Sequence, residues 1–211
     1  MAIEAMEEDG AGVKESLAPL SLAEALAKVE ASLPESLPTL SKPVLLMISG
    51  LPGAGKSHVA RKLMERTPFV IIEADWVRKT LFAEPDYSGE ESILVHRTCR
   101  ALMEKLLAKG VPVIYDATNL IEYQRGMAYH LARKTGVKLV VVRVTAPEEV
   151  IRERLEGREK ERTPEDVSDA TWGVYKRMAE REQPIERAHL VIDTSQDLEE
   201  GIRKILREIR R

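Results

Sequence analysis

The 211-residue sequence has little of three things: cysteine, aromatic side chains and long apolar segments. Its single cysteine, Cys99, excludes an internal disulfide bond and is typical of a reducing compartment. No segment approaches the ~18 uncharged apolar residues of a membrane-spanning helix, and the acidic start MAIEAMEEDG is no secretory signal. We therefore expect a soluble, cytoplasmic protein. Because only 4% of the residues are aromatic, its core must be mostly aliphatic.

The chain also lacks a large excess of charge of either sign. It has 32 Lys and Arg against 35 Asp and Glu, a net charge of −3. In residues 1–42, eight acids and three bases give −5, which leaves +2 for the remainder. Neither value selects between small-molecule and nucleic-acid partners. The shift in composition divides the chain into an acidic N-terminal arm, residues 1–42, and a main domain, residues 43–211.

The arm contains one predicted helix. Residues 1–20 are small, acidic and aperiodic, which is typical of a loosely held segment. Ser21 and Glu24 then form a capping box, and apolar residues follow at helical spacing until Pro34. Two interpretations stay open: the helix packs on the main domain, or it docks a partner.

In the main domain, short apolar segments alternate with helix-length segments. Apolar runs without internal alternation predict strands covered on both faces, and their alternation with helices predicts a parallel sheet. The predicted strands are residues 44–49, 69–72, 111–115, 139–144 and 189–192. The predicted helices are residues 57–66, 75–82, 90–109, 122–135, 147–156, 164–183 and 198–210. We therefore expect a three-layer α/β domain around a five-stranded parallel sheet.

A phosphate-binding loop is the strongest signal in the sequence. The pattern G-x-x-x-x-G-K-[ST] is matched by Gly50-Leu51-Pro52-Gly53-Ala54-Gly55-Lys56-Ser57. Glycines allow the backbone amides to point inward, where side chains would collide with a phosphate. We expect Lys56 to reach the β- and γ-phosphates and Ser57 to be a magnesium ligand. The whole segment and the following His58 are predicted to bind ATP, with Mg2+ as the metal.

The end of the second predicted strand supplies candidate acceptor residues. Asp75 follows that strand, at the edge where open α/β sheets bind ligands. A carboxylate there can accept the proton of an attacking hydroxyl. Arg78 lies one helical turn further on the same face and can hold the acceptor or a neighbouring phosphate. The alternative is that Asp75 only caps the helix and pairs with Arg78.

The end of the third predicted strand carries a second acid. Asp116 either belongs to the magnesium shell or contacts the acceptor, and the sequence leaves both open. Thr118 and Asn119 follow it, either with a functional role or in a local turn. Arg125 on the next helix is a weaker acceptor candidate. Residues 193–195, after the fifth strand, are expected beside the nucleotide base.

The charged segment 152–162 is predicted to form a lid. A solvated helix with i,i+4 ion pairs would explain its acids. It explains Gly157 less well, because glycine weakens a helix near its middle. Arg154, Arg158 and Arg162 also form a like-charged row that needs an anion. Arginines that fold over a triphosphate stabilise the transferred phosphoryl group, and closure excludes water.

This order of motifs, continued by Asp169-Ala-Thr-Trp, resembles the P-loop kinases grouped with polynucleotide 5′-hydroxyl kinases. The resemblance covers residues 43–211 and implies an adenylate-kinase-like fold with sheet order 2-3-1-4-5 and a helical lid. It implies that Asp75 is the general base and that Arg78 binds acceptor phosphate. The lid arginines Arg154 and Arg158 would contact the donor phosphates.

The acceptor-binding prediction comprises Asp75, Arg78, Asp116, Asn119 and Arg125. We expect an ATP-dependent phosphotransferase that moves the γ-phosphate to a hydroxyl, with a polynucleotide 5′-hydroxyl as the first candidate.

Two other functions stay open. A metabolite or antibiotic kinase is one. The net charge of +2 over residues 43–211 is a weak indication of nucleic-acid binding, and the same superfamily includes antibiotic and sugar kinases. Glu73, Trp76 and Tyr87 would then line a closed pocket. The other is a non-catalytic ATP-binding regulator whose arm engages a partner.

Overall fold

The computed structural model describes residues 20–160 and 169–211, apart from the side chain of Glu159. The loosely held segment predicted before Leu20 and the lid residue Arg162 therefore lie outside the described residues. Within the described ranges, no helix is long and apolar enough to cross a membrane.

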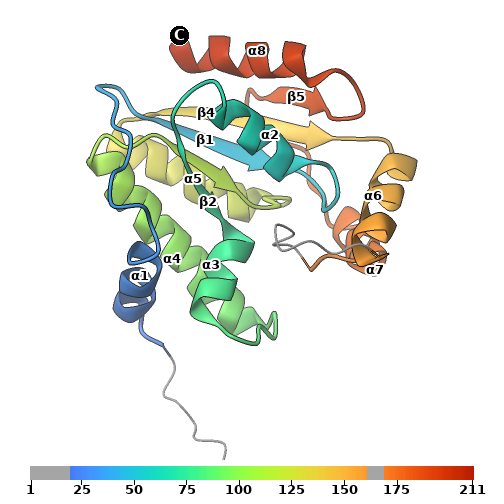
Figure 1. Ribbon diagram of the computed structural model, residues 1–211, viewed down its shortest axis with the longest axis horizontal. Coiled ribbons are helices and arrows are strands. Elements are labelled where there is room, and N and C mark those ends of the chain that lie inside the picture. Colours follow the sequence, from blue (N-terminus) through green and yellow to red (C-terminus); the bar gives the residue numbers. More distant parts are fainter. Residues whose placement is uncertain (1–19, 161–168) are drawn as a thin grey trace, which may run out of the picture.

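The sheet has five parallel strands in the order β2-β3-β1-β4-β5 (Figure 1). The strands are β1 Val44–Ser49, β2 Val70–Glu73, β3 Val113–Asp116, β4 Lys138–Thr145 and β5 Leu190–Asp193. The predicted three-layer α/β fold and the implied order 2-3-1-4-5 are confirmed. The bounds of β1 agree with the prediction, whereas β2, β3 and β5 each end one residue later, on an acid.

Helices cover both faces of the sheet (Figure 1). One face carries α2 Lys56–Met64 and α8 Leu198–Arg210. The other face carries α4 Gly89–Ala108 and α5 Glu122–Thr135, with α1 Leu22–Glu30 and α3 Ala74–Leu81 packed against α4. The remaining helices, α6 Glu148–Lys160 and α7 Trp172–Ala179, pack together beyond the carboxyl ends of the strands.

Strand β1 shows why its sequence is apolar without alternation. All six of its residues are buried. Leu45 and Met47 belong to the core beneath α1, α3, α4 and α5, whereas Val44, Leu46 and Ile48 belong to the core beneath α2 and α8. Successive side chains of a strand point to opposite faces, so the five residues before Ser49, which lie between two cores, are all apolar.

Helix α1 from the N-terminal arm is part of the larger core. The predicted capping box is present at its start. Ala25 and Val29 are fully buried against α3 and α4. The ammonium of Lys28 donates a 3.1 Å hydrogen bond to the carbonyl of Leu81 at the end of α3. Helix α1 therefore braces α3, which carries Asp75 and Arg78, and the neighbouring α4.

Two predicted helix boundaries need correction. Of the helix predicted over 164–183, residues 164–168 lie outside the described residues, and the described part contains α7, which ends at Ala179 before Pro184. The helix predicted over 147–156 is α6, which continues through Gly157 to Lys160. Nothing lies within 4 Å of the position that a Cβ of Gly157 would take, so this glycine occupies an exposed helical site that tolerates it.

Candidate active site

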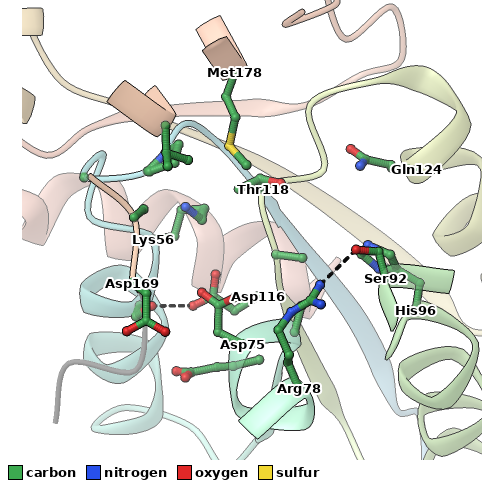
Figure 2. Close-up of a pocket in the computed structure, with 18 of the residues that line it drawn as sticks. Lys56, Asp75, Arg78, Ser92, His96, Asp116, Thr118, Gln124, Asp169 and Met178 are labelled. Atoms are coloured by element: carbon green, nitrogen blue, oxygen red, sulfur yellow. Dashed lines mark hydrogen bonds between the residues drawn. The ribbon is translucent and has the colours of Figure 1, made fainter. Parts of the chain in front are cut away.

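A cavity of about 1580 Å³ lies at the carboxyl edge of the sheet. Its walls come from the loops after β1 and β3 and from helices α2, α3, α4, α5, α6 and α7. Figure 2 shows part of this lining. Cavities for one small molecule are usually ~300–1,000 Å³. The cavity therefore has room for two substrates side by side.

Close contacts within the protein require glycine in the phosphate-binding loop, in addition to the room that a bound phosphate would need. A Cβ on Gly50 would lie 2.3 Å from the carbonyl oxygen of Val144 in β4. Gly55 has φ of 91° and is the N-cap of α2, where a Cβ would lie 3.1 Å from Thr194. Both positions favour glycine because other residues rarely adopt such φ values and no space remains for a side chain.

The loop presents its second half to the cavity. The predicted nucleotide-binding residues that line the cavity are Pro52, Gly53, Gly55, Lys56, Ser57, His58 and Arg154. Gly50, Leu51 and Ala54 are not among the lining residues and form the back of the loop. The ammonium of Lys56 donates a 3.1 Å hydrogen bond to the carbonyl of Leu51. Burial lowers the pKa of Lys56, an effect that the carboxylate of Asp116 opposes.

Ser57 and Asp116, the two residues predicted to hold magnesium, lie together. The Ser57 hydroxyl donates a 2.7 Å hydrogen bond to Oδ2 of Asp116, which is only 5% exposed. Burial raises the pKa of Asp116, whereas Lys56 and the Ser57 hydrogen bond lower it. Hydroxyl and carboxylate oxygens are the hard ligands that Mg2+ prefers beside phosphate oxygens. The two residues therefore fit this metal.

Two more carboxylates stand beside Asp116. Asp75 lies in the first turn of α3, and its carboxylate shares the centre of the cavity with that of Asp116 (Figure 2). Glu73, the last residue of β2, also lines the cavity. Burial, followed by the neighbouring charge of Asp116, raises the pKa of Glu73. Trp76, which we expected in the same wall, instead packs against the core.

Arg78 is held rigidly, but by residues other than Asp75. Its guanidinium forms a buried ion pair with Glu91 and donates a 3.2 Å hydrogen bond to Ser92 (Figure 2). It also lies 4.6 Å from the ring centroid of Tyr87. The alternative in which Arg78 pairs with Asp75 is thus wrong.

One nitrogen of this guanidinium, Nε of Arg78, is buried without a hydrogen-bond partner in the described part of the chain. A buried donor left unsatisfied is costly. Arg78 lines the cavity although it is only 7% exposed, so its guanidinium contributes positive charge to the cavity wall.

Helix α6 brings its arginines to the nucleotide side of the cavity. Arg154 donates hydrogen bonds to the carbonyl of Gly53 at 3.3 Å and to the hydroxyl of Thr194 at 2.7 Å. Thr194 in turn donates to the carbonyl of Ala54 at 2.8 Å. Arg158, one turn further along, lines the same cavity. Thr194, within the segment expected beside the base, therefore connects α6 to the phosphate-binding loop.

Asn119 and Arg125 do not reach the cavity, which corrects their prediction as acceptor ligands. Asn119 has φ of 47°, and its amide donates a 2.7 Å hydrogen bond to the carbonyl of Ile48. Arg125 is 0% exposed and donates to the carbonyls of Asn119, Leu120 and Pro184. Both shape the loop after β3, which is the turn alternative considered for Asn119.

Our sequence reasoning missed the wall formed by α4. Ser92, His96 and Arg100 line the cavity at i,i+4 spacing, and Arg97 lies beside them. Nδ1 of His96 lies 3.0 Å from the hydroxyl of Tyr115. Burial, followed by the charge of Arg78, lowers the pKa of His96. The helical spacing of polar residues in 90–109 was the available signal, but it is indistinguishable from a solvated helix face.

Asp169, part of the motif quoted for the resemblance, reaches the acceptor side of the cavity. It accepts a 2.7 Å hydrogen bond from the hydroxyl of Tyr87 and a 3.3 Å hydrogen bond from Lys79. The segment before α7 is therefore tied to α3 and to the loop after it.

The sheet order and the phosphate-binding loop, with an acid and an arginine after β2, make this chain a P-loop kinase-like nucleotide-binding protein. Residues 45–184 match the AAA_33 family, described as an AAA domain, and the chain belongs to that family.

Two proteins of similar sequence show the range of proteins that this chain resembles. The probable adenylyl-sulfate kinase of Aeropyrum pernix is 28% identical over 162 residues, which cover 74% of this chain and 85% of that protein. An uncharacterized protein of Mycobacterium tuberculosis is 29% identical over 170 residues, or 75% of this chain. The match spans 33% of that mycobacterial protein.

Two solved structures share the fold. The APS kinase CysC of Mycobacterium tuberculosis, in complex with AMPPNP and APS, has a TM-score of 0.62 at 18% identity, covering 82% of this chain and 100% of that one. Kti12 of Chaetomium thermophilum, in complex with ADP-AlF3, has a TM-score of 0.64 at 21% identity, with coverages of 79% and 97%. These comparisons support a kinase-like class, but not the narrower likeness to polynucleotide kinases.

Proposed function

We propose that the chain is an ATP-dependent phosphotransferase that moves the γ-phosphate to a hydroxyl of an anionic acceptor. A polynucleotide with a 5′-hydroxyl end is the first acceptor to test. The observation that carries the proposal is the presence, in one cavity, of the carboxylate of Asp75 and the guanidinium of Arg78, which Glu91 and Ser92 hold in place.

The donor side is built for a triphosphate. The backbone amides of the loop, the start of α2 and the ammonium of Lys56 supply positive charge for the β- and γ-phosphates. Arg154 and Arg158 add guanidinium groups from α6. Ser57 and Asp116 would hold Mg2+, which, when bound, neutralises phosphate charge.

Asp75 serves as the general base in this proposal. It accepts the proton of the acceptor hydroxyl as that oxygen forms a bond to the γ-phosphorus. The bond between the γ-phosphorus and the bridging oxygen breaks, and ADP leaves with the electron pair. The proton remains on the Asp75 carboxylate until the product is released.

Arg78 serves as the anion-binding residue of the acceptor. Glu91 and Ser92 fix its guanidinium at the cavity, where its positive charge attracts an anionic group of the acceptor. A preorganised donor of this kind binds phosphate or sulfate without losing side-chain entropy.

Adenylyl sulfate is the second candidate acceptor. The similarity to the probable adenylyl-sulfate kinase of Aeropyrum pernix, which extends over 85% of that protein, favours it. Its sulfate would occupy the same anion position at Arg78.

Transfer of label from ATP labelled at its γ-phosphate tests the proposal. We would offer 5′-hydroxyl DNA and RNA oligonucleotides, the same oligonucleotides already 5′-phosphorylated, and adenylyl sulfate, each with Mg2+. We expect label on the 5′-hydroxyl oligonucleotides and none on the phosphorylated ones. Label on adenylyl sulfate alone would replace the first candidate with the second. Protection by ATP against thermal unfolding without transfer to any acceptor would contradict a catalytic role.

A further inference from the structure

The outer part of the cavity, away from the phosphate-binding loop, lies between α4 and α5. Ile93, Arg97 and Arg100 line it from α4 at positions i, i+4 and i+7, which share one helix face. Tyr123 and Met127 line it from α5 at positions i and i+4. We call these five residues the α4–α5 subsite. It continues the wall that begins with Ser92 and His96 beside Arg78 (Figure 2).

Two apolar side chains of the α4–α5 subsite are open to solvent. Tyr123 is 89% exposed and Ile93 is 60% exposed. A single exposed apolar residue needs no explanation. Here, however, both stand on the rim of the cavity that contains Asp75, so they offer an aromatic face and an aliphatic contact to a ligand that leaves the cavity.

The same rim is positively charged. Arg97 and Arg100 on α4, and Arg177 and Arg181 on and just after α7, line the cavity. No hydrogen bond or ion pair engages these four side chains among residues 20–160 and 169–211. Asp169, an acid that lines the same cavity, is engaged by Lys79 and Tyr87. Unpaired guanidinium groups around a cavity mouth attract an anionic ligand and can stack on its rings.

We propose that the α4–α5 subsite binds the nucleotide that follows the phosphorylated end of a single-stranded acceptor. Its base stacks on Tyr123, and the phosphodiester lies against Arg97 and Arg100. This inference rests on the proposed function and makes the subsite a determinant of acceptor specificity.

The combination of features favours a strand over a free mononucleotide. The cavity of about 1580 Å³ has room for an acceptor beside ATP, and its lining extends to the exposed residues of the α4–α5 subsite. A stacking ring beside unpaired arginines is the usual composition of single-strand sites, because every base has a flat face and every nucleotide a phosphate. Since Tyr123 and Ile93 are exposed rather than enclosed, a chain bound there can continue into solvent.

Fluorescence anisotropy measures this binding without turnover. The probe is a single-stranded 5′-hydroxyl oligonucleotide with a dye at its 3′ end, titrated with protein and a non-hydrolysable ATP analogue. The variants are Tyr123→Ala, Tyr123→Phe, and Arg97→Ala combined with Arg100→Ala. Arg203→Ala on α8, which lies on the other face of the sheet, is the matched control for loss of an exposed arginine.

We expect Tyr123→Ala to raise Kd about tenfold, because stacking is lost, and Tyr123→Phe to stay within about twofold of wild type. The double arginine variant should raise Kd and flatten the dependence of log Kd on log salt concentration by about 0.7 per lost phosphate contact. Arg203→Ala should change neither quantity.

The outcomes separate this inference from the proposed function. If the wild type binds and labels oligonucleotides while the Tyr123→Ala and double arginine variants bind equally well, the subsite is wrong and the polynucleotide kinase stands. If the wild type binds no oligonucleotide, the subsite and the polynucleotide acceptor are both overturned. Transfer to adenylyl sulfate would then show whether the phosphotransferase itself survives.

Discussion

The hydroxyl of Ser57 donates a 2.7 Å hydrogen bond to the carboxylate of Asp116, joining the start of α2 to the end of β3. If this pair holds the magnesium ion, Asp116→Asn should raise the Mg2+ concentration for half-maximal phosphate transfer about tenfold or more, because a charged ligand is lost. A magnesium titration of activity measures this. Thermal stability should not fall, because Asn removes a buried carboxylate whose pKa is raised by burial. An unchanged magnesium requirement would exclude Asp116 from the metal site.

Gly50 in the phosphate-binding loop and Gly157 on α6 allow a matched test of two glycines. Gly50→Ala should lower the free energy of unfolding by about 1–3 kcal/mol, since its Cβ would meet the carbonyl of Val144. Gly157→Ala on exposed α6 should raise it by about 0.5–1 kcal/mol. Denaturant titration followed by circular dichroism measures both. Equal changes in the free energy of unfolding of the two variants would contradict the close approach of Gly50 to β4.

The buried ion pair between Arg78 and Glu91 should be important for both stability and acceptor binding. Glu91→Gln leaves the Arg78 charge buried and uncompensated, so the free energy of unfolding should fall by about 3 kcal/mol. The KM for the acceptor should rise while the KM for ATP changes little. The control is Glu65→Gln, which breaks the exposed pair with Lys62 and should cost less than about 1 kcal/mol. Similar losses in the two variants would refute the structural role of Glu91.

Glu73 gives a prediction about pH. Burial and the charge of Asp116 raise the pKa of Glu73 from its ordinary value of 4.5. The folded protein therefore binds this proton more tightly than the unfolded chain. The resulting stabilisation is complete below the unfolded pKa and is lost as pH rises through the folded pKa.

Glu73→Gln should consequently raise the melting temperature at about pH 7.5, and the gain should shrink towards about pH 4. Thermal unfolding across this range measures the difference, with the exposed Glu84→Gln as a control. If the gain in melting temperature instead grows as the pH is lowered, the folded protein favours the charged form of Glu73.

The features of the structure that depend on short-range sequence patterns were predicted correctly. The apolar run of β1, the glycines before Lys56 and the acid after β2 are each local, so the fold, the loop and the position of Asp75 followed from them. The partners of Arg78 did not follow. Glu91 lies 13 residues away on another helix, and only packing brings the two charges together.

Asn119 and Arg125, in contrast, were predicted to contact the acceptor but do not reach the cavity. Both are polar residues close to β3 in sequence, so they were predicted to face the ligand. In the structure Asn119 takes a left-handed conformation and Arg125 turns inward to satisfy carbonyls of distant segments, including Pro184. A sequence pattern gives the proximity of such residues to a site but not the direction of their side chains.

The central claim is that Asp75 accepts the proton of an acceptor hydroxyl during phosphate transfer from ATP. The most direct test compares the wild type with Asp75→Asn for transfer of the γ-phosphate to the acceptor that the wild type labels, with ATP-dependent thermal protection measured in parallel. We predict that kcat falls about 10²–10⁴-fold in Asp75→Asn while ATP protection is retained. A variant that transfers phosphate at the wild-type rate would contradict the account.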